Sequence, residues 1–529
     1  MIDANQLTPN ETYNLIEEME RYDSDRLALK WQDDKGSRRE VTYHELIQQA
    51  NQYANVLTGL GLSKGDKVLV MVPRLVEAYV TYYACLKAGL VIIPSSEMLR
   101  ADDIKYRADH SGSRAIISYA PYADEIDRMD PMPETLEHKL MIGGSKEGWK
   151  EIETMAAEES QSFNIVQTHR DDTAFLPYTS GTTGKPKAVV HSHGWAYAHL
   201  RVAADEWLDI HENDVVWATA GPGWQKWVWS PFLSVLGQGA TGFAYNGRFD
   251  PETYLQLLQD EKVNVLCCTP TEYRLMAKIE GLEKYDLSAM HSAVSAGEPL
   301  NEEVIQVFRD KFNLPVRDGY GQTESTLLIG TLKGVPEKIG SMGKPMIEQF
   351  IEIVDEDGNP AQTNEIGNIA VHRDLPSLFQ GYYKEPERTS DSYQGDYFLT
   401  GDRAMKDEDN YYWFQGRSDD IIISSGYTIG PFEVEDALTK HPSVKECAAV
   451  ASPDDIRGNV VKAFIVPNGQ VENEEDLTKE LQNHVKEMTA PYKYPRRIEF
   501  VESLPKTSSA KIRRVELREQ ELAKANNNK

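Results

Sequence analysis

The chain has 529 residues and a mass of 59.8 kDa, and its 84 Asp and Glu residues outnumber 56 Lys and Arg, giving a net charge of −28 at pH 7. A hydrophobic content of 40% supplies enough apolar material for large cores, which excludes a globally disordered chain. The acidic balance disfavours nucleic acids and anionic lipid surfaces as main partners, because both carry negative charge. The length predicts either one large α/β domain with a smaller companion or several folding units.

Cysteine usage and the N-terminal segment bear on the compartment. The four cysteines include no CxxC pair, so neither a disulfide framework nor a zinc site is indicated, and we expect buried thiols. The segment MIDANQLTPNETYNLIEEME is polar and acidic, unlike a targeting peptide. Apolar runs such as KVLVMVP are much shorter than the roughly 18 residues of a membrane span. We therefore expect a cytoplasmic protein without a transmembrane segment.

Residues 42–143 alternate between helical and strand patterns. Residues 43–61 have apolar positions at helical spacing and end in glycine, and the run KVLVMVP that follows predicts a buried strand. A helix over 74–89 and a strand over 90–94 repeat the pattern, as does the stretch up to AIIS. The same alternation returns from residue 251 to SAGEPL. Short β-branched runs between helices predict βαβ units and parallel sheets.

The pattern changes after about residue 343. Short strand patterns separated by turn sequences such as DEDGNP predict a meander or a small barrel. From residue 419 a compact α+β segment follows, ending in a basic helix. We expect a large domain over 1–418 and a small domain over 419–529. Residues 491–529 carry 10 basic and 5 acidic side chains, so the positive charge gathers in the small domain.

The strongest local signal is YTSGTTGKPKAVVHSH at residues 178–193. Glycines allow backbone N–H groups to turn inward, and the hydroxyls and lysines add further donors, as an anion-binding loop requires. The spacing is not that of a Walker A loop, and a strand-like run rather than a helix follows it. These features exclude a P-loop kinase or GTPase.

TSGTTGKPK closely resembles the phosphate loop of adenylate-forming enzymes, the superfamily of acyl-CoA synthetases, luciferases and peptide-synthetase adenylation domains. Four further blocks follow in the family's order, namely SAGEPL, DGYGQTE, TGD with GRSDD, and PKTSSAK. Within the superfamily, SGYTIGPFEVE and PYKYPRRIEFV look most similar to medium-chain acyl-CoA synthetases. The resemblance covers essentially the whole chain. It implies a large domain of parallel sheets plus a small barrel, followed by a small mobile α+β domain.

The resemblance assigns ATP and Mg²⁺ to these blocks. Tyr320 would pack on adenine, Asp402 and Arg417 would hold the ribose, and Glu324 would hold the metal ion. The implied nucleotide-binding set is Thr179, Ser180, Gly181, Thr182, Thr183, Gly184, Lys185, Lys187, Gly297, Glu298, Pro299, Asp318, Gly319, Tyr320, Gly321, Gln322, Thr323, Glu324, Asp402 and Arg417.

The resemblance also implies two catalytic steps. Lys511 would offset the repulsion between a carboxylate and the α-phosphate, with Thr182 and Glu324 as further catalytic residues. The small domain would then turn about Asp419 so that the thiol of coenzyme A can attack the acyl-adenylate. The implied coenzyme A set is Ser425, Gly426, Tyr427, Arg457 and Lys486.

Two positions bear on the acid and two depart from the family pattern. Trp224 resembles a pocket-lining tryptophan, and Gly321 stands where acetate-specific relatives have a tryptophan, which predicts an open pocket for a short, medium-chain, branched or small aryl acid. Ala510 replaces the usual glycine before the catalytic lysine, and Thr428 replaces the usual Arg or Lys after SGY. Either replacement is expected to reduce activity.

These features predict an ATP-dependent, AMP-forming carboxylate:coenzyme A ligase of class EC 6.2.1. The alternatives are a ligase that delivers the acyl group to a carrier-protein phosphopantetheine, a luciferase-type oxygenase, and a non-catalytic adenylate-binding protein. The expected partners are a small carboxylic acid, ATP and coenzyme A, with homo-oligomerisation left open.

Overall fold

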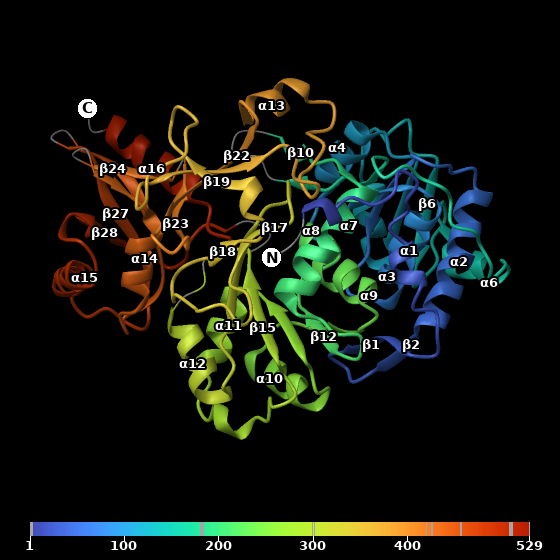
Figure 1. The fold of residues 1–529 in the computed structure, drawn as a ribbon, viewed down its shortest axis with the longest axis horizontal. Coiled ribbons are helices and arrows are strands. Elements are labelled where there is room, and N and C mark those ends of the chain that lie inside the picture. The colour runs from blue at the N-terminus through green and yellow to red at the C-terminus, as the bar shows by residue number, and fades with distance from the viewer. Residues whose placement is uncertain are drawn as a thin grey trace.

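The computed structural model describes residues 4–179, 185–298, 300, 302–418, 420–424, 427–454, 457–506 and 511–527. Two large, mostly parallel sheets form the body, an antiparallel sheet adjoins them, and a smaller α+β unit lies at one side (Figure 1). Among the described residues, no helix combines the length and apolarity that crossing a membrane requires.

The first large sheet has seven strands in the order β11-β8-β4-β3-β5-β6-β7. All neighbours pair in parallel except β8 and β11. Its strands are β3 (Lys67–Met71), β4 (Val91–Pro94), β5 (Ala115–Tyr119), β6 (His138–Ile142), β7 (Lys150–Glu151), β8 (Thr173–Phe175) and β11 (His191–Ser192). The associated helices are α2 (Tyr43–Gly59), α3 (Val76–Lys87), α4 (Ala101–Ser111), α5 (Ala123–Asp127) and α6 (Ile152–Ala157).

Strand β3 shows why the strands of this sheet are continuous apolar runs in the sequence. Val68 and Val70 belong to the core shared with α2 and α3, whereas Leu69 and Met71 belong to the core shared with α4 and α5. Because successive strand side chains point to opposite faces, a sheet covered by helices on both sides needs apolar residues at every position. The expected βαβ alternation in this region is confirmed.

The second large sheet has nine strands in the order β18-β17-β16-β15-β14-β12-β13-β1-β2. The six strands from β16 to β1 run parallel, and the sheet ends in antiparallel strands on both sides. Its strands are β1 (Leu27–Asp33), β2 (Arg38–Thr42), β12 (Val215–Ala218), β13 (Thr241–Asn246), β14 (Val265–Cys268), β15 (Ser292–Ala296), β16 (Arg317–Gly321), β17 (Leu327–Gly330) and β18 (Lys344–Pro345).

Helices cover both faces of the nine-stranded sheet. One core joins the sheet to α10 (Pro251–Asp260), α11 (Pro270–Ala277) and α12 (Glu302–Phe312). On the other face, α7 (His193–His199) continues into the π-helix η3 (Leu200–Leu208), and α8 (Gln225–Trp227) continues into the π-helix η4 (Val228–Ser234) and α9 (Val235–Gly237). Residues of η3 share a core with alternate positions of β14 and β15.

The third sheet is antiparallel and lies beside the first two. It contains β19 (Ile351–Val354), β20 (Gly367–His372), β21 (Tyr393–Gln394), β22 (Tyr397–Lys406) and β23 (Tyr412–Arg417). Strand β22 pairs with β20, β21 and β23, and β19 pairs with β20. Within the described residues these pairings do not close, so the unit is an open sheet, and the expectation of a small barrel is wrong. Turn chemistry predicts the hairpins, but closure depends on whether the outer strands pair.

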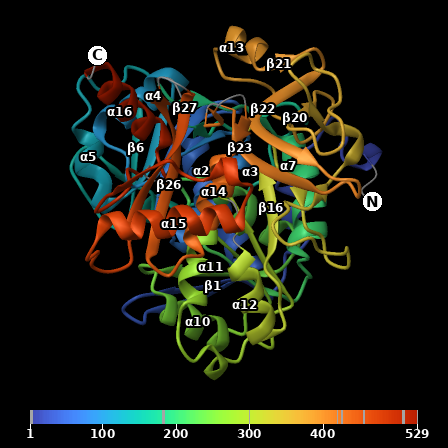
Figure 2. The same cartoon turned by 90° about the vertical axis from the view of Figure 1, so that its left-hand side faces the viewer.

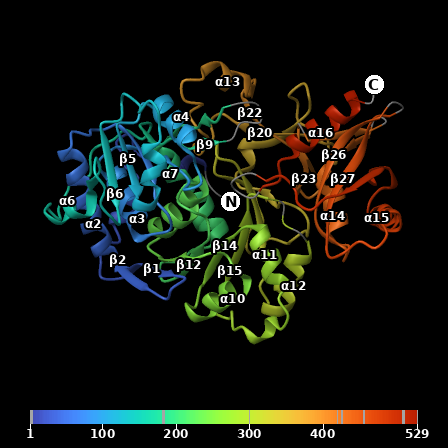
Figure 3. The ribbon, with the colours of Figure 1, turned by 180° about the vertical axis from the view of Figure 1, so that it is seen from behind.

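The C-terminal unit packs helices on both faces of a three-stranded sheet of β26 (Val444–Asp454), β27 (Gly458–Pro467) and β28 (Arg497–Phe500). One face packs against α14 (Pro431–Thr439) and α15 (Glu474–Met488), and the other against α16 (Arg514–Asn527). A short hairpin of β24 (Ile422–Ser424) and β25 (Tyr427–Ile429) precedes them. Figures 2 and 3 show this unit, in orange and red, beside the sheet that contains β15 and β16.

Candidate active site

The described residues of the predicted blocks come together where the carboxyl ends of β15 and β16 face β22, β23 and the C-terminal unit. Parallel strands end at the same sheet edge, so the residues that follow β15 and those within β16 lie next to each other. This edge of an open α/β sheet is where ligands are commonly bound.

Asp402 is the centre of one hydrogen-bonded group. Its Oδ2 accepts from the Tyr320 hydroxyl at 2.6 Å and from Gln322 Nε2 at 2.6 Å. The same Gln322 nitrogen also donates to the backbone oxygen of Thr400 at 2.9 Å. Both contacts to Asp402 use Oδ2, which leaves Oδ1 as the acceptor for a ligand hydroxyl.

Arg417 lies directly opposite Asp402 in the β22–β23 pairing. Burial raises the pKa of Asp402, while Arg417, Tyr320, Gln322 and Lys511 all act to lower it. The predicted ribose pair is therefore adjacent by strand register alone, in a site with little water.

The segment after β15 approaches the same space. Gly297 has a φ of +105°, and a side chain there would point into open space. Glu298 Oε2 accepts a 3.1 Å hydrogen bond from Thr271 Oγ1 on α11. Glycine at this position allows the left-handed turn that brings the following backbone to the sheet edge. Pro299 lies outside the described residues.

Asp318 is a half-buried residue on β16, opposite Ser295 of β15. Burial raises its pKa to about 7, although the backbone N–H of Gly319 and the charge of Lys226 act in the opposite direction. The N–H of Gly319 donates to Asp318 Oδ1 at 2.9 Å. This carboxyl is held by the backbone rather than by an ion pair.

Glu324, Lys187 and Tyr382 form a second polar group. Lys187 Nζ lies 3.0 Å from Glu324 Oε1, which also accepts from the Tyr382 hydroxyl at 2.9 Å. The Lys187 ammonium also lies 4.1 Å from the centre of the Tyr382 ring and donates to its hydroxyl at 2.6 Å. The backbone oxygen of Thr323 accepts from Nε2 of the buried His191, which positions this loop.

The start of the glycine-rich loop is part of a short hairpin. Strand β9 (Tyr178–Thr179) pairs with β10 (Lys187–Ala188), so Thr179 faces Lys187. Thr179 Oγ1 is buried without a hydrogen-bond partner, and Lys185 Nζ lies 5.3 Å from the Tyr106 ring centre. The predicted residues Ser180, Gly181, Thr182, Thr183 and Gly184 lie outside the described residues.

Lys511 enters this site from the C-terminal unit. A bridge between Lys506 and Ile512 closes the loop that carries it. Its side chain is exposed, yet the surrounding protein atoms lower its pKa, with Glu298 and Asp402 acting to raise it and Lys226 and Arg417 to lower it. The predicted catalytic lysine is thus within electrostatic reach of the nucleotide residues of the large domain.

The predicted coenzyme A residues are dispersed over the C-terminal unit. Lys486 Nζ lies 4.2 Å from the Tyr494 ring centre and 3.4 Å from Asn483 Oδ1, while Arg457 lies in the turn between β26 and β27. Tyr427 begins β25, paired with Ser424. Ser425, Gly426, the predicted hinge residue Asp419 and Ala510 lie outside the described residues, and Thr428 is described only as backbone.

The two acyl-pocket predictions have different surroundings. Trp224 is half-buried and precedes α8. At Gly321 a Cβ atom would lie 2.3 Å from the backbone oxygen of Thr326, so the close approach of two backbone segments requires glycine there. An open pocket floor is therefore not the sole physical reason for this glycine.

Two site residues were missed by sequence reasoning. Lys226 Nζ donates to the carbonyl of Ala296 at 2.7 Å and acts electrostatically on Asp318 and Lys511. Tyr382 links Lys187 to Glu324. The only sequence signals were a lysine between tryptophans in GPGWQKW and a tyrosine pair in GYYKEP, neither of which indicates a site.

Comparison with known proteins agrees with this geometry. Residues 16–383 match the AMP-binding enzyme family and residues 433–511 match the AMP-binding enzyme C-terminal domain. The chain is 59% identical to an uncharacterized acyl-CoA ligase, YtcI, of Bacillus subtilis, covering 96% of both chains. It is 43% identical to the mitochondrial acyl-coenzyme A synthetase ACSM3 of Rattus norvegicus, covering 93% of this chain and 86% of that protein.

Solved structures are similar over nearly the whole length. The anthranilate CoA ligase AuaEII, in complex with anthranoyl-AMP, has a TM-score of 0.91 at 28% identity, covering 99% of this chain and 100% of that one. A benzoate CoA ligase from Burkholderia xenovorans has a TM-score of 0.84 at 28% identity, covering 96% and 100%. The chain therefore belongs to the adenylate-forming, AMP-binding enzyme family, near the medium-chain acyl-coenzyme A synthetases.

Proposed function

We propose that this protein is an ATP-dependent, AMP-forming acyl-coenzyme A synthetase. A carboxylate oxygen attacks the α-phosphorus of ATP and pyrophosphate leaves; the thiol of coenzyme A then attacks the acyl-adenylate carbonyl and AMP leaves. The observation that carries the proposal is the group around Asp402, which accepts 2.6 Å hydrogen bonds from Tyr320 and Gln322 and lies opposite Arg417 in the β22–β23 pairing.

Lys511 supports the first step by its charge. Both reactants are anions, and an ammonium between them offsets their repulsion and stabilises the charge that develops on the α-phosphate. The surrounding protein atoms, together with the charges of Lys226 and Arg417, lower the pKa of Lys511 in the unliganded protein. The polyphosphate of ATP favours the charged form, because opposite charges raise the pKa of an amine.

The nucleotide residues bind the sugar and base. Asp402 Oδ1 accepts from the ribose hydroxyls, because Oδ2 is occupied by Tyr320 and Gln322. Arg417, opposite Asp402, donates to the same sugar region. The ring of Tyr320 packs against adenine beside Glu298 and Asp318.

The residues at the phosphate end fit a magnesium ion. Both contacts that Glu324 makes through its carboxylate use Oε1, so Oε2 remains as the hard oxygen ligand that Mg²⁺ prefers. Thr179 and Lys187 pair with each other at the two ends of the glycine-rich loop. Thr179 Oγ1 has no hydrogen-bond partner, and a phosphate oxygen would provide one. The bound ion supplies charge neutralisation on the phosphates.

For the second step we propose that the C-terminal unit turns about Asp419. Lys511 then leaves the site, and the β24–β25 hairpin with Ser425, Gly426 and Tyr427 takes its place along the pantetheine. Arg457 and Lys486 are positively charged groups on the same unit for the coenzyme A phosphates. Gly426 has no side chain, which leaves room for the thiol arm.

The acid is proposed to be a short, medium-chain or branched aliphatic acid, or a small aryl acid. The names of the relatives support this range, since they include an acyl-coenzyme A synthetase and ligases for anthranilate and benzoate. Trp224 is the proposed wall of the pocket. The four described cysteines are unpaired and buried, which fits the proposed cytoplasmic location.

The test measures pyrophosphate release and thioester formation against a panel of C2–C10 and small aryl acids, with and without coenzyme A. Acid-dependent pyrophosphate release together with coenzyme A-dependent AMP and thioester formation supports the proposal. No acid-dependent release contradicts an enzymatic role and favours an adenylate-binding protein. Release without thioester indicates delivery to a carrier protein.

A further inference from the structure

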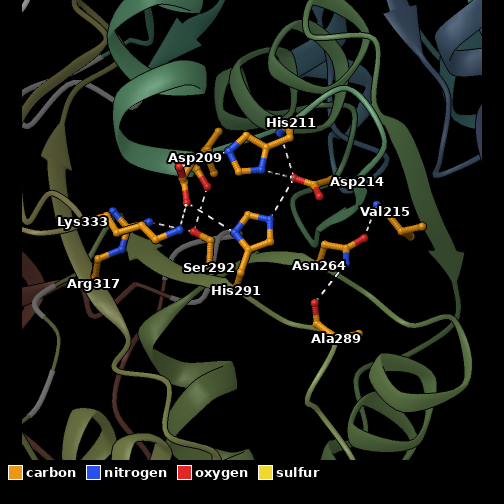
Figure 4. Close-up of polar contacts among 11 residues, drawn as sticks. Asp209, His211, Asp214, Val215, Asn264, Ala289, His291, Ser292, Arg317 and Lys333 are labelled. Atoms are coloured by element: carbon orange, nitrogen blue, oxygen red, sulfur yellow. Dashed lines mark hydrogen bonds and ion pairs between the residues drawn. The ribbon is translucent and has the colours of Figure 1, made fainter.

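Away from the nucleotide site, two histidines and two aspartates gather at the opposite edge of the nine-stranded sheet (Figure 4). Asp209 caps η3, His211 and Asp214 lie in the loop before β12, and His291 directly precedes β15. The active-site residues follow the carboxyl end of β15, which puts the length of this strand, about 16 Å, between the two clusters. We propose that His211, Asp214 and His291 bind a divalent transition-metal ion of the Zn²⁺ class.

The three candidate ligand atoms have the spacing of a coordination sphere. Asp214 Oδ2 lies 2.9 Å from His291 Nε2 and 3.6 Å from His211 Nδ1, and one atom from each of the three residues lies within 4.8 Å of the others. Bonds of about 2.0–2.1 Å at tetrahedral angles separate ligand atoms by about 3.3 Å. The two distances to Asp214 bracket that value, and all three atoms lie within 4.8 Å of one another, so side-chain movements can bring them around one ion. Water completes the sphere.

The second nitrogen of each ring has a carboxylate beside it. His291 Nδ1 lies 3.3 Å from Asp209 Oδ2, and His211 Nε2 lies 3.5 Å from Asp209 Oδ1. Metal-binding histidines usually donate the remaining ring N–H to a carboxylate, which orients the ring and makes the ligand nitrogen more basic. Asp209 lies beside the second nitrogen of both rings, and a small movement of the His291 ring would let it accept from both.

His291 Nδ1 provides an independent observation. It is buried and makes no hydrogen bond, because its 3.3 Å approach to Asp209 lacks hydrogen-bond geometry. The two imidazoles are also stacked, with ring centres 5.0 Å apart and an interplanar angle of 23°, so both rings lie next to Asp214.

The two aspartates differ in the charged groups that surround them. Lys333 Nζ lies 2.6 Å from Asp209 Oδ2, and the charge of Arg317 reaches the same carboxylate. Asp214 is 7% exposed, and within the described structure its side-chain partners are the two imidazoles and the backbone N–H of His211. Asp214 is therefore the buried carboxylate whose charge a metal ion would balance.

The surrounding strands hold the ligands in place. Asn264, just before β14, accepts from the backbone N–H of Val215 at 2.7 Å and donates to the Ala289 oxygen at 3.0 Å. This side chain ties the start of β12 to the segment that leads to His291. A ligand set of two imidazoles and a carboxylate suits Zn²⁺, Co²⁺ or Ni²⁺ better than Mg²⁺, which prefers oxygen ligands alone.

The first experiment titrates the untagged, full-length protein with Zn²⁺ by isothermal calorimetry. We expect one saturable site per chain, weakened at least tenfold in His211→Ala and in His291→Ala, and weakened by about 10- to 100-fold in Asp209→Asn, which removes the carboxylate behind both rings. His44→Ala is the matched control, because His44 faces a single aspartate, Asp23, at 2.9 Å. No saturable site, or equal loss in His44→Ala, overturns the proposal.

The second experiment identifies the metal class and guards against misfolded variants. Bound Co²⁺ should give visible d–d absorption, which should disappear when Zn²⁺ is added but not when equimolar Mg²⁺ is added. Loss of the absorption with Mg²⁺ would overturn the proposed metal class. Zn²⁺ should raise the Tm of the wild type but not of His211→Ala, whose side chain is 64% exposed in the wild type and costs little packing on removal. An equal rise in both proteins also contradicts the site.

Discussion

The hydroxyl of Tyr320 donates a 2.6 Å hydrogen bond to Oδ2 of Asp402, joining the nine-stranded sheet to the antiparallel sheet. This bond favours the charged carboxylate, whereas burial raises its pKa. The charged form is the one that accepts hydrogen bonds from a sugar.

Tyr320→Phe should therefore shift the pH dependence of the reaction. Losing this bond raises the pKa of Asp402 further, so the acidic limb of kcat/KM for ATP should move to higher pH. Pyrophosphate release measured from pH 5 to 9 checks the shift. Tyr411→Phe, which removes a hydroxyl bonded to the Pro336 oxygen, is the control. An unchanged acidic limb in Tyr320→Phe would contradict the role given to Asp402.

Lys511→Ala should separate the two half-reactions. We expect adenylation to fall by about 10²–10³-fold, the usual cost of removing one electrostatic stabiliser, while thioester formation from supplied acyl-adenylate is retained. Lys506→Ala is the matched control on the same loop, since Lys506 pairs with Glu446 at 2.8 Å. Equal loss of both steps in Lys511→Ala would exclude a role confined to the first step.

Glu324→Gln should raise the Mg²⁺ requirement. The amide still accepts from Tyr382 but no longer binds a cation by charge, so we expect an increase of about 10- to 100-fold in the Mg²⁺ concentration for half-maximal pyrophosphate release. The exposed Glu387→Gln is the control. An unchanged Mg²⁺ titration would remove Glu324 from the metal site.

Gly321→Ala tests why glycine stands at this position. Because a Cβ would lie 2.3 Å from the Thr326 oxygen, we expect lower Tm and lower activity with every acid. Trp224→Ala should instead change the preference among acids. Chain-length profiles and thermal unfolding distinguish the two. A stable Gly321→Ala protein with a shortened acid range would show that the pocket explanation is sufficient.

Three buried histidines predict acid sensitivity. Burial lowers the pKa of His191 to about 3 and those of His193 and His199 to about 4. Below the ordinary histidine pKa of 6.5 these residues are protonated in the unfolded chain but stay neutral in the folded chain. Their contribution to the free energy of unfolding is therefore present above pH 6.5 and is lost as the pH falls towards 4. Each histidine contributes about 1.4 kcal/mol per pH unit within that window.

Urea unfolding between pH 7.5 and 5 measures this slope. His191→Gln should make the slope shallower by about one proton, because its Nε2 contact to Thr323 can be made by an amide that does not titrate. A slope equal to that of the wild type would show that His191 is protonated in the folded protein.

The fold was largely predictable because local patterns carry it. Strands such as Lys67–Met71, which are apolar after the first residue and lie between amphipathic helices, indicate a parallel sheet before any tertiary information is used. The small barrel failed because closure depends on pairing between β19 and the outer strands, which turn sequences do not encode. The motif blocks predicted both the family and the site, because their residues and their order along the chain match those of the family's binding segments.

Contacts between distant segments could not be predicted. Lys226 reaches Ala296 across 70 residues, and Tyr382 reaches Lys187 across 195. Neither has a local signal, because the partner that gives each residue its role lies on another element. The histidines of the proposed metal site are likewise 80 residues apart in a chain whose cysteine spacing indicated no zinc.

Strand β23 ends with Arg417, two residues before the proposed pivot Asp419. Points close to a rotation axis move least when a body turns. If a sugar binds to Asp402 and Arg417 as we propose, it would therefore lie near the rotation axis. On the proposed mechanism AMP would stay in place through both half-reactions while the rotation moves Lys511 away from it.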